Sequence, residues 1–264
     1  VPAVYSSGPL SELPMEAVDT LISARWVIPI EPATSVLERH SVAVRQGRIV
    51  AILPTAEATL RYSALEVLDR PTHALLPGFV NACAGIGAAT AVGGAPAAPG
   101  LDPEQVRDTV ALSLLRMLAS GTTSFAGGSL FPQMVARTAA DMHLRACIGL
   151  PVLEEPTGWA ASVDEYLEKA GALHDDYSED PLITTAFATG EPSRLDDATL
   201  QRMRRAADEI ELPVLVPLHE HANSLTLSLE RFGCRPLERL ERLGLATPLL
   251  VCLHGPHLTT SDMD

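Results

Sequence analysis

Side chains that could bind a metal or transfer protons fall in two short stretches of the second half of the chain. One stretch, LHEH, holds His219, Glu220 and His221, and the other, LHGPH, holds His254 and His257. Side chains two residues apart point to the same face of a strand, so His219 and His221 could act together. Imidazole suits zinc and iron, and the four histidines could form one metal site. The alternative is that they are polar residues hydrogen-bonded at the rim of a pocket.

Cys83 is a candidate for nucleophilic chemistry. It follows a predicted strand and could use His219 or His254 as its base. Its neighbours are alanine and glycine, a setting in which cysteine more often serves as a small apolar filler. Both interpretations remain open at the level of the sequence.

The segment GIGAA at residues 85–89 imitates the GxGxxA fingerprint of dinucleotide-binding proteins. That fingerprint requires a helix to begin at once, whereas two adjacent glycines and two prolines follow within residues 93–99. We therefore expect no Rossmann-type nucleotide site.

The elements that must position these residues alternate between strands and helices from Leu75 onward, which indicates a parallel sheet with crossover helices. Asp102 and Pro103 are typical of a helix start, and Ser162 is a further N-cap. The predicted strands cover 75–81, 122–125, 144–150, 181–188, 214–219 and 248–254. The predicted helices cover 102–120, 131–142, 163–177 and 196–211, followed by two helices after Asn223 that are separated at Gly233 and Pro236.

The N-terminal part follows a different pattern. Residues 18–30 and 41–53 alternate apolar and polar side chains, and Gln46-Gly47 lies where a hairpin would turn. We expect a small antiparallel sheet there. The domain prediction is a flexible arm over 1–17, a partial β-sandwich over 18–70 and a partial barrel over 71–264.

The phrase PGFVNA at residues 77–82 resembles the PGxxNAHxH signature of the amidohydrolase superfamily, in its methylthioadenosine/S-adenosylhomocysteine deaminase and chlorohydrolase branch. The resemblance implies an α/β fold: a (β/α)8-type barrel, here apparently truncated after about six units, with a small N-terminal antiparallel β-sandwich portion. A barrel removes its sheet edges by closing, so a six-strand version must have its two edges covered. A longer polypeptide, another chain or some other cover could do this.

The resemblance also implies a metal-dependent hydrolase, but this chain departs from the family at the metal ligands. The two strand-end histidines of the signature are replaced by Cys83 and Gly85, and the metal histidine of the fifth-strand HxxE pattern is replaced by Pro217. Gly and Pro have no side-chain donor, and one thiolate is a poor site for a catalytic divalent ion. The resemblance implies that a metal would be held at these positions, but the residues present there lack the necessary donors. We therefore expect no cofactor, unless the cluster of four histidines binds zinc or iron instead.

Other family positions are retained. Glu220 matches the glutamate of HxxE and His254 matches the histidine that ends the sixth strand, so both are expected as vestigial proton shuttles. At the fourth strand the chain reads ATGEP, where Gly190 replaces a substrate-contacting histidine. We assign substrate binding to Glu220 and Glu191.

The sequence therefore favours a non-catalytic amidohydrolase-like protein, a pseudoenzyme with a structural or assembly role, which binds a second copy or another subunit through the open barrel edge. One alternative is a metal-dependent deaminase that acts on an amino-substituted heterocycle through the rebuilt cluster of His219, His221, His254 and His257. A second alternative is a small-molecule binding protein that uses the old pocket without chemistry.

Composition excludes other classes of partner. The formal net charge of −14 disfavours nucleic acid and anionic membranes, and no apolar run reaches the 18 residues of a membrane-spanning helix. The N-terminal residues lack the pattern of a secretory signal, and the four cysteines match no CxxC spacing. We expect reduced thiols and a cytoplasmic location.

Overall fold

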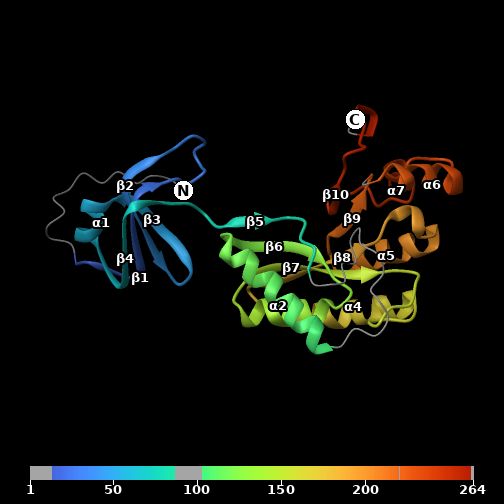
Figure 1. Ribbon diagram of the computed structural model, residues 1–264, viewed down its shortest axis with the longest axis horizontal. Coiled ribbons are helices and arrows are strands. Elements are labelled where there is room, and N and C mark those ends of the chain that lie inside the picture. Colours follow the sequence, from blue (N-terminus) through green and yellow to red (C-terminus); the bar gives the residue numbers. More distant parts are fainter. Residues whose placement is uncertain (1–13, 87–102, 220, 263–264) are drawn as a thin grey trace. The chain divides into compact units, whose positions relative to one another are not determined.

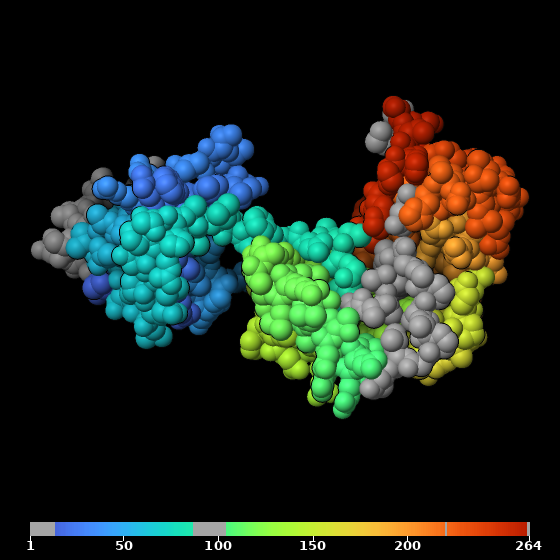
Figure 2. Space-filling model, in the orientation of Figure 1, coloured from blue at the N-terminus to red at the C-terminus, as the bar shows by residue number. Residues whose placement is uncertain are grey.

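The computed structural model describes residues 14–86, 103–219 and 221–262, and the chain divides into two compact units, Val1–Pro77 and Gly78–Asp264 (Figure 1; Figure 2). Of the arm predicted over 1–17, residues 1–13 lie outside the described residues, whereas Glu16 and Ala17 belong to the first strand. The helix start at Asp102 and most of the glycine-rich segment after Ile86 also lie outside the described residues.

The first unit is a four-stranded sheet with the order β3-β2-β1-β4. Its strands are β1 (Glu16–Val27), β2 (Leu37–Arg45), β3 (Arg48–Pro54) and β4 (Tyr62–Leu75). Gln46 and Gly47 both have positive φ, 51° and 69°, which confirms the predicted hairpin turn between β2 and β3. A short helix, α1 (Thr55–Arg61), follows β3.

The sheet is mixed rather than purely antiparallel as predicted. β1 pairs antiparallel with β2, but it pairs parallel with β4. The reason is α1, which carries the chain from the end of β3 back across to the other side of β1. The core of this unit lies under α1, where Ala58 and Tyr62 pack with Val18, Leu21 and Leu53.

The length of β4 also places the boundary between the two units at a different residue from the one that the sequence predicted. The sequence prediction started the first barrel strand at Leu75, but Leu75 is the last residue of β4 and pairs with Val27 of β1. The first strand of the second unit is β5, which is limited to Phe79–Asn81. The second unit therefore begins at Gly78 instead of at residue 71.

The second unit is a six-stranded parallel sheet with the order β10-β9-β8-β7-β6-β5. The strands after β5 are β6 (Thr122–Gly128), β7 (Arg145–Val152), β8 (Ile183–Thr189), β9 (Val214–Leu218) and β10 (Leu250–His254). The helices are α2 (Pro103–Ala119), α3 (Pro132–Asp141), α4 (Val163–Tyr177), α5 (Asp197–Glu209), α6 (Ala222–Phe232) and α7 (Pro236–Arg242), with 3₁₀ turns η1 (Pro192–Arg194) and η2 (Thr260–Asp262). The alternation and the separation of α6 from α7 are as the sequence predicted.

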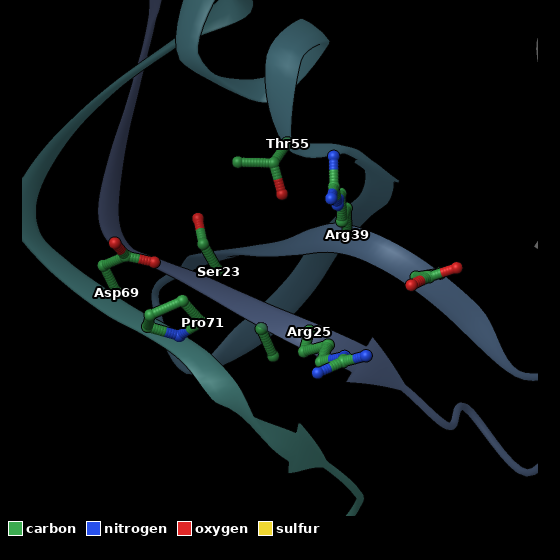
Figure 3. A pocket seen from close by; sticks show the side chains of 8 residues that line it. Ser23, Arg25, Arg39, Thr55, Asp69 and Pro71 are labelled. Carbon is green, nitrogen blue, oxygen red and sulfur yellow. The ribbon is translucent and has the colours of Figure 1, made fainter.

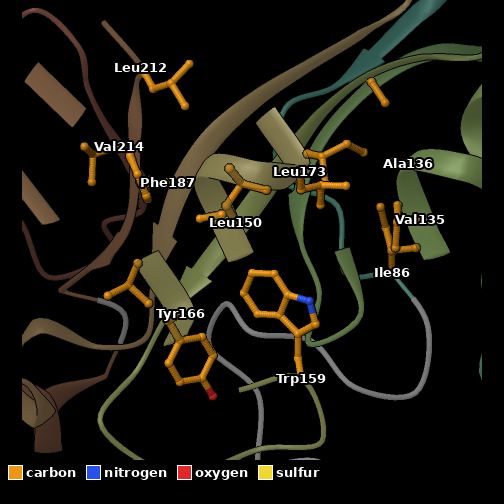
Figure 4. Packing of buried hydrophobic residues seen from close by; sticks show 14 of the residues in the cluster. Ile86, Val135, Ala136, Leu150, Trp159, Tyr166, Leu173, Phe187, Leu212 and Val214 are labelled. Atoms are coloured by element: carbon orange, nitrogen blue, oxygen red, sulfur yellow. The ribbon is translucent and has the colours of Figure 1, made fainter. Parts of the chain in front are cut away.

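Apolar side chains cover both faces of this sheet. Between the sheet and its helices, Leu150, Phe187 and Val214 pack with Trp159 and Tyr166 (Figure 4). The alternate residues on the opposite face form a second, smaller cluster that consists of Ala186, Ala188, Leu215 and Leu253. A parallel sheet buried on both faces is typical of barrel and doubly wound α/β folds. The observed unit is a curved half-barrel of six strands.

Candidate functional site

The carboxyl ends of the parallel strands bring together residues that are distant in sequence. His254 is the last residue of β10, His219 directly follows β9, and Cys83 lies two residues after β5. Both histidines have left-handed backbones, with φ of 67° at His254 and 55° at His219. Side chains at this edge of an α/β barrel are where active sites form.

The structure brings Cys83 and His254 together. Cys83 Sγ lies 3.8 Å from His254 Nε2, although β5 and β10 are the first and last strands in the order of the sheet. A flat sheet with neighbours about 4.8 Å apart would separate its outer strands by about 24 Å over five spacings. The contact therefore depends on the strong curvature of the half-barrel. His254 is the partner that the sequence offered for Cys83, together with His219.

His219 is held in a different environment. Its side chain is buried, with 2% of the residue exposed, and its Nε2 accepts a hydrogen bond of 3.3 Å from the backbone N–H of Leu237 at the start of α7. Nε2 is thus an acceptor, and Nδ1 lies 3.3 Å from the carbonyl oxygen of His257 and 3.1 Å from the Arg235 guanidinium. Both ring nitrogens of His219 therefore contact protein groups.

Arg235 and Asp262 complete this network, and the sequence analysis named neither of them. The Arg235 guanidinium donates to both carboxylate oxygens of Asp262, at 2.9 and 2.7 Å, and to the carbonyl of His257 at 2.9 Å. Thr259 donates to Asp262 through its N–H and its hydroxyl, each at 2.7 Å. No local spacing marks this pair because the two residues are 27 positions apart.

The network shifts the pKa of three groups, and the hydrogen bonds to Asp262 raise that of Arg235. Hydrogen bonds from Arg235 hold the pKa of the Asp262 carboxyl well below its ordinary value. Burial lowers the pKa of His219, and the nearby Arg235 charge acts in the same direction, while the Asp262 carboxylate and the hydrogen bond to His257 oppose it. The geometry thus favours a neutral His219 beside an ion pair.

Glu191 contacts a helix of the same unit. Its carboxylate accepts a hydrogen bond from the Ser224 hydroxyl on α6 and lies 3.8 Å from the Arg194 guanidinium. The side chain is 14% exposed. Glu191 is therefore largely used in joining η1 to α6. Glu220, the other predicted substrate contact, lies outside the described residues.

The four histidines of the rebuilt-site interpretation do not form one group in the structure. His221 is the N-cap residue of α6, and the backbone N–H of His257 donates to the carbonyl of His219 at 3.3 Å. Across residues 14–86, 103–219 and 221–262, no three histidine, cysteine, aspartate or glutamate side chains lie together as a metal ion would require.

The residues at the family ligand positions also do not fit a catalytic metal. Gly85 has no side chain, and Pro217 lies within β9, opposite Leu253 of β10. The pairing between β8 and β9 ends at Ala188 and Leu215. Pro217 has no N–H to donate, and it lies beyond this paired part of β9. Catalytic zinc sites usually have three protein ligands and an open position for water. Of these three positions only Cys83 offers a donor.

A separate pocket of about 470 Å³ lies in the first unit (Figure 3). Its lining includes two guanidinium groups and two carboxylates, from Arg25, Arg39, Glu38 and Asp69. It contains none of the residues that the sequence marked for chemistry. Among the described residues, no helix has both the length and the apolar character needed to cross a membrane.

The fold defines the class of (β/α)-barrel proteins, in which sites form at the carboxyl ends of the strands. Residues 64–264 match the amidohydrolase family, and the chain belongs to this family. The resemblance seen in PGFVNA is thereby confirmed.

Similar proteins include two curated 5-methylthioadenosine/S-adenosylhomocysteine deaminases. The one from Saccharophagus degradans is 30% identical over 260 residues, which cover 93% of this chain and 58% of the relative. The one from Teredinibacter turnerae is 32% identical over 262 residues, which cover 93% and 59%. The chain thus spans about three-fifths of the length of these relatives.

Two solved structures show the same fold. An adenosine deaminase from Xanthomonas campestris with bound zinc is 37% identical, with a TM-score of 0.87 over 95% of this chain and 60% of that one. Atrazine chlorohydrolase TrzN from Arthrobacter aurescens, in complex with zinc, is 16% identical, with a TM-score of 0.77 over 92% and 62%. The first supports the family and the second the fold alone.

Proposed function

We propose that this chain is a deaminase-type amidohydrolase fold that does not hydrolyse substrates by the metal-dependent route and that serves a structural or assembly role. The observation that carries the proposal is the residue set at the family ligand positions, where Gly85 and Pro217 offer no side-chain donor. A hydrolytic deaminase needs hydroxide at neutral pH, and a metal supplies it by lowering the pKa of bound water from about 16 to about 7. Glu220 and His254 could still move protons, but they would have no activated water to act on.

The engagement of His219 also supports this proposal. A histidine that binds metal needs a ring nitrogen with an available lone pair. In His219, Nε2 accepts a hydrogen bond from the backbone N–H of Leu237, and Nδ1 lies against the carbonyl oxygen of His257. Recruiting His219 would break the first turn of α7 or the loop that contains His257. A rebuilt histidine site would therefore cost part of the fold around β9 and β10.

Release of ammonia tests the proposal. The chain, supplied with zinc, is mixed with adenosine, 5′-methylthioadenosine or S-adenosylhomocysteine, the compounds named in its relatives. We expect no ammonia above that of a blank. Turnover that is abolished by His254→Ala would contradict the proposal and would support a metal-dependent deaminase.

The assembly role rests on the outer strands of the sheet. Within the described residues β5 pairs only with β6, and Phe79 and Val80 of β5 are 60% and 70% exposed. Exposed apolar residues on a strand that has one unpaired edge favour pairing of that edge with another segment. We propose that a second copy of the chain or another protein subunit covers this edge, at a cytoplasmic location.

Sedimentation measurements test the self-association. We expect a dimer or larger species, which Val80→Lys would dissociate because the charge would be placed on the paired edge. A suitable control is Leu65→Lys, since Leu65 is exposed on β4 of the first unit. A monomer at all concentrations would contradict self-association through this edge.

A further inference from the structure

The four cysteines of this chain are thiols in markedly different surroundings. Cys83 and Cys252 are exposed, Cys147 is half-buried and Cys234 is buried. Of these, Cys83 has an imidazole nitrogen within reach, because His254 Nε2 lies 3.8 Å from its sulfur. This separation is within the range of a hydrogen bond that involves sulfur, so a proton can pass between the two side chains.

The chain holds both partners in place from the backbone. The N–H of Ala84 donates to the carbonyl of Ala126 on β6 at 2.8 Å, and the N–H of Cys83 donates to Asn81 Oδ1 at 3.3 Å. These bonds fix the backbone of Cys83 and of Ala84, the residue that follows it. On the opposite side, His254 is the last paired residue of β10, opposite Leu218 of β9.

The other cysteines lack this environment. Desolvation raises the pKa of the Cys147 and Cys252 thiols, which disfavours the reactive thiolate. Cys234 is 3% exposed, so a reagent cannot reach it without local unfolding. Cys252 is the best internal reference because it is exposed and lies on the same strand as His254.

We propose that Cys83 is a nucleophilic thiol that forms a covalent adduct with small electrophiles at the carboxyl end of the half-barrel, with His254 as the acceptor of its proton. The proton moves from Sγ to Nε2, and a sulfur lone pair attacks an electrophilic carbon that bears a leaving group. The S–C bond forms as the bond to the leaving group breaks, and the leaving group departs with its electron pair. This activity needs neither metal nor water, and it goes beyond the proposed structural role.

Competitive alkylation of the intact chain tests the proposal. Limiting iodoacetamide is added, the reaction is quenched at intervals, and tryptic peptides are quantified by mass spectrometry. Trypsin does not cut before proline, and the Lys and Arg positions place each of the four cysteines on its own peptide. We expect Cys83 to react at least about tenfold faster than Cys252, as a thiolate favoured by a neighbouring base would.

Two variants decide whether His254 is the base. His254→Gln should reduce the rate at Cys83 to about that of Cys252 and leave the rate at Cys252 unchanged. His221→Gln, which changes a histidine at the start of α6, should leave both rates unchanged. Equal rates at Cys83 and Cys252 in the wild-type chain would overturn the proposal without any variant, and an unchanged rate at Cys83 in His254→Gln would overturn the role of His254.

Discussion

At the level of single residues, Arg235 and Asp262 determine what His219 can do. The two charged side chains pair with each other, and the same guanidinium group fixes the carbonyl of His257 toward the imidazole. Burial lowers the pKa of His219, and the Arg235 charge acts in the same direction, so the imidazole stays neutral. A histidine at a strand end, which from its sequence position could bind metal, instead ties the start of α7 to the loop after β10.

The lowered pKa of His219 predicts a pH-dependent stability. As the pH falls below about 6.5, the ordinary histidine pKa, the unfolded chain takes up a proton that folded His219 does not, so the free energy of unfolding decreases. The lowered pKa of Asp262 adds a second loss below about 3.9, where the unfolded carboxylate is protonated first.

Urea unfolding at about pH 7.5 and about pH 5.5, on either side of the ordinary histidine pKa, measures the first effect. Trp159 is buried in the second unit and reports its unfolding if Trp26 is first replaced by Phe. His219→Gln keeps an acceptor for Leu237 but does not titrate, so its midpoint should fall less than that of the parent chain. Equal losses in the two proteins would contradict the assignment.

Arg239 provides a second prediction for a single residue. It is 3% exposed, donates to Asp197 and to the carbonyls of Pro192 and Leu195 at 2.6 to 2.8 Å, and its guanidinium lies 3.4 Å from the centre of the Phe232 ring. Arg239→Met should lower the free energy of unfolding by about 3 kcal/mol, because buried carbonyls lose their donors.

The matched control for this change is Arg242→Met on the same helix. Arg242 is exposed and pairs with Glu238, so its loss should change stability by less than about 0.5 kcal/mol. The same urea experiment measures both variants. A similar effect at the two positions would show that Arg239 does not act through its buried hydrogen bonds.

At the level of elements, the position of Cys83 depends on how closely the segment after β5 approaches β6. Gly127 makes this approach possible, because a Cβ at this position would lie 2.1 Å from the carbonyl oxygen of Ala84. The chain can therefore continue along β6 for three residues beyond β5, with Ala84 bonded to Ala126.

Gly127→Ala should destabilise the second unit by about 2 kcal/mol through overpacking and should slow the alkylation of Cys83 by moving it away from His254. Gly171→Ala is the contrasting change, since Gly171 lies inside α4 with no atoms within 4 Å of the new Cβ. It should stabilise the chain by about 0.5 to 1 kcal/mol and leave the alkylation rate unchanged. Unfolding midpoints and labelling rates of the two variants check both expectations.

Elements with local signals could be predicted from the sequence. Ser162 caps α4 by accepting a hydrogen bond from the N–H of Glu165, and Gly233 ends α6 with a positive φ of 69°. α1 was not predicted because it is seven residues long and its N-cap is Pro54, without a side-chain cap. The extension of β4 to Leu75 depends on pairing with β1, which local patterning does not show.

The same distinction applies to the candidate site. The sequence marked Cys83, His219 and His254 as strand-end residues, because each follows a recognisable apolar run. Which of these side chains are in contact depends on the curvature of the sheet, which brings Cys83 after β5 close to His254 at the end of β10. His219 instead contacts Arg235 and Leu237. Neither curvature nor these long-range partners have a signal in the local sequence.

At the level of the whole molecule, the chain keeps the scaffold of the amidohydrolase family while the donors at the family ligand positions are changed. The six strands, their helices and the strand-end His254 are retained, so the fold does not require the metal histidines. Burial on both faces of the sheet supplies the core.

Elemental analysis of the chain tests the central claim most directly. The protein, prepared without a histidine tag, is incubated with zinc, desalted without chelator and analysed for zinc per chain. With one thiol among Cys83, Gly85 and Pro217, we predict that zinc remains far below stoichiometric. Stoichiometric zinc that is lost in His254→Ala would contradict the account and would mean that a rebuilt site holds the metal.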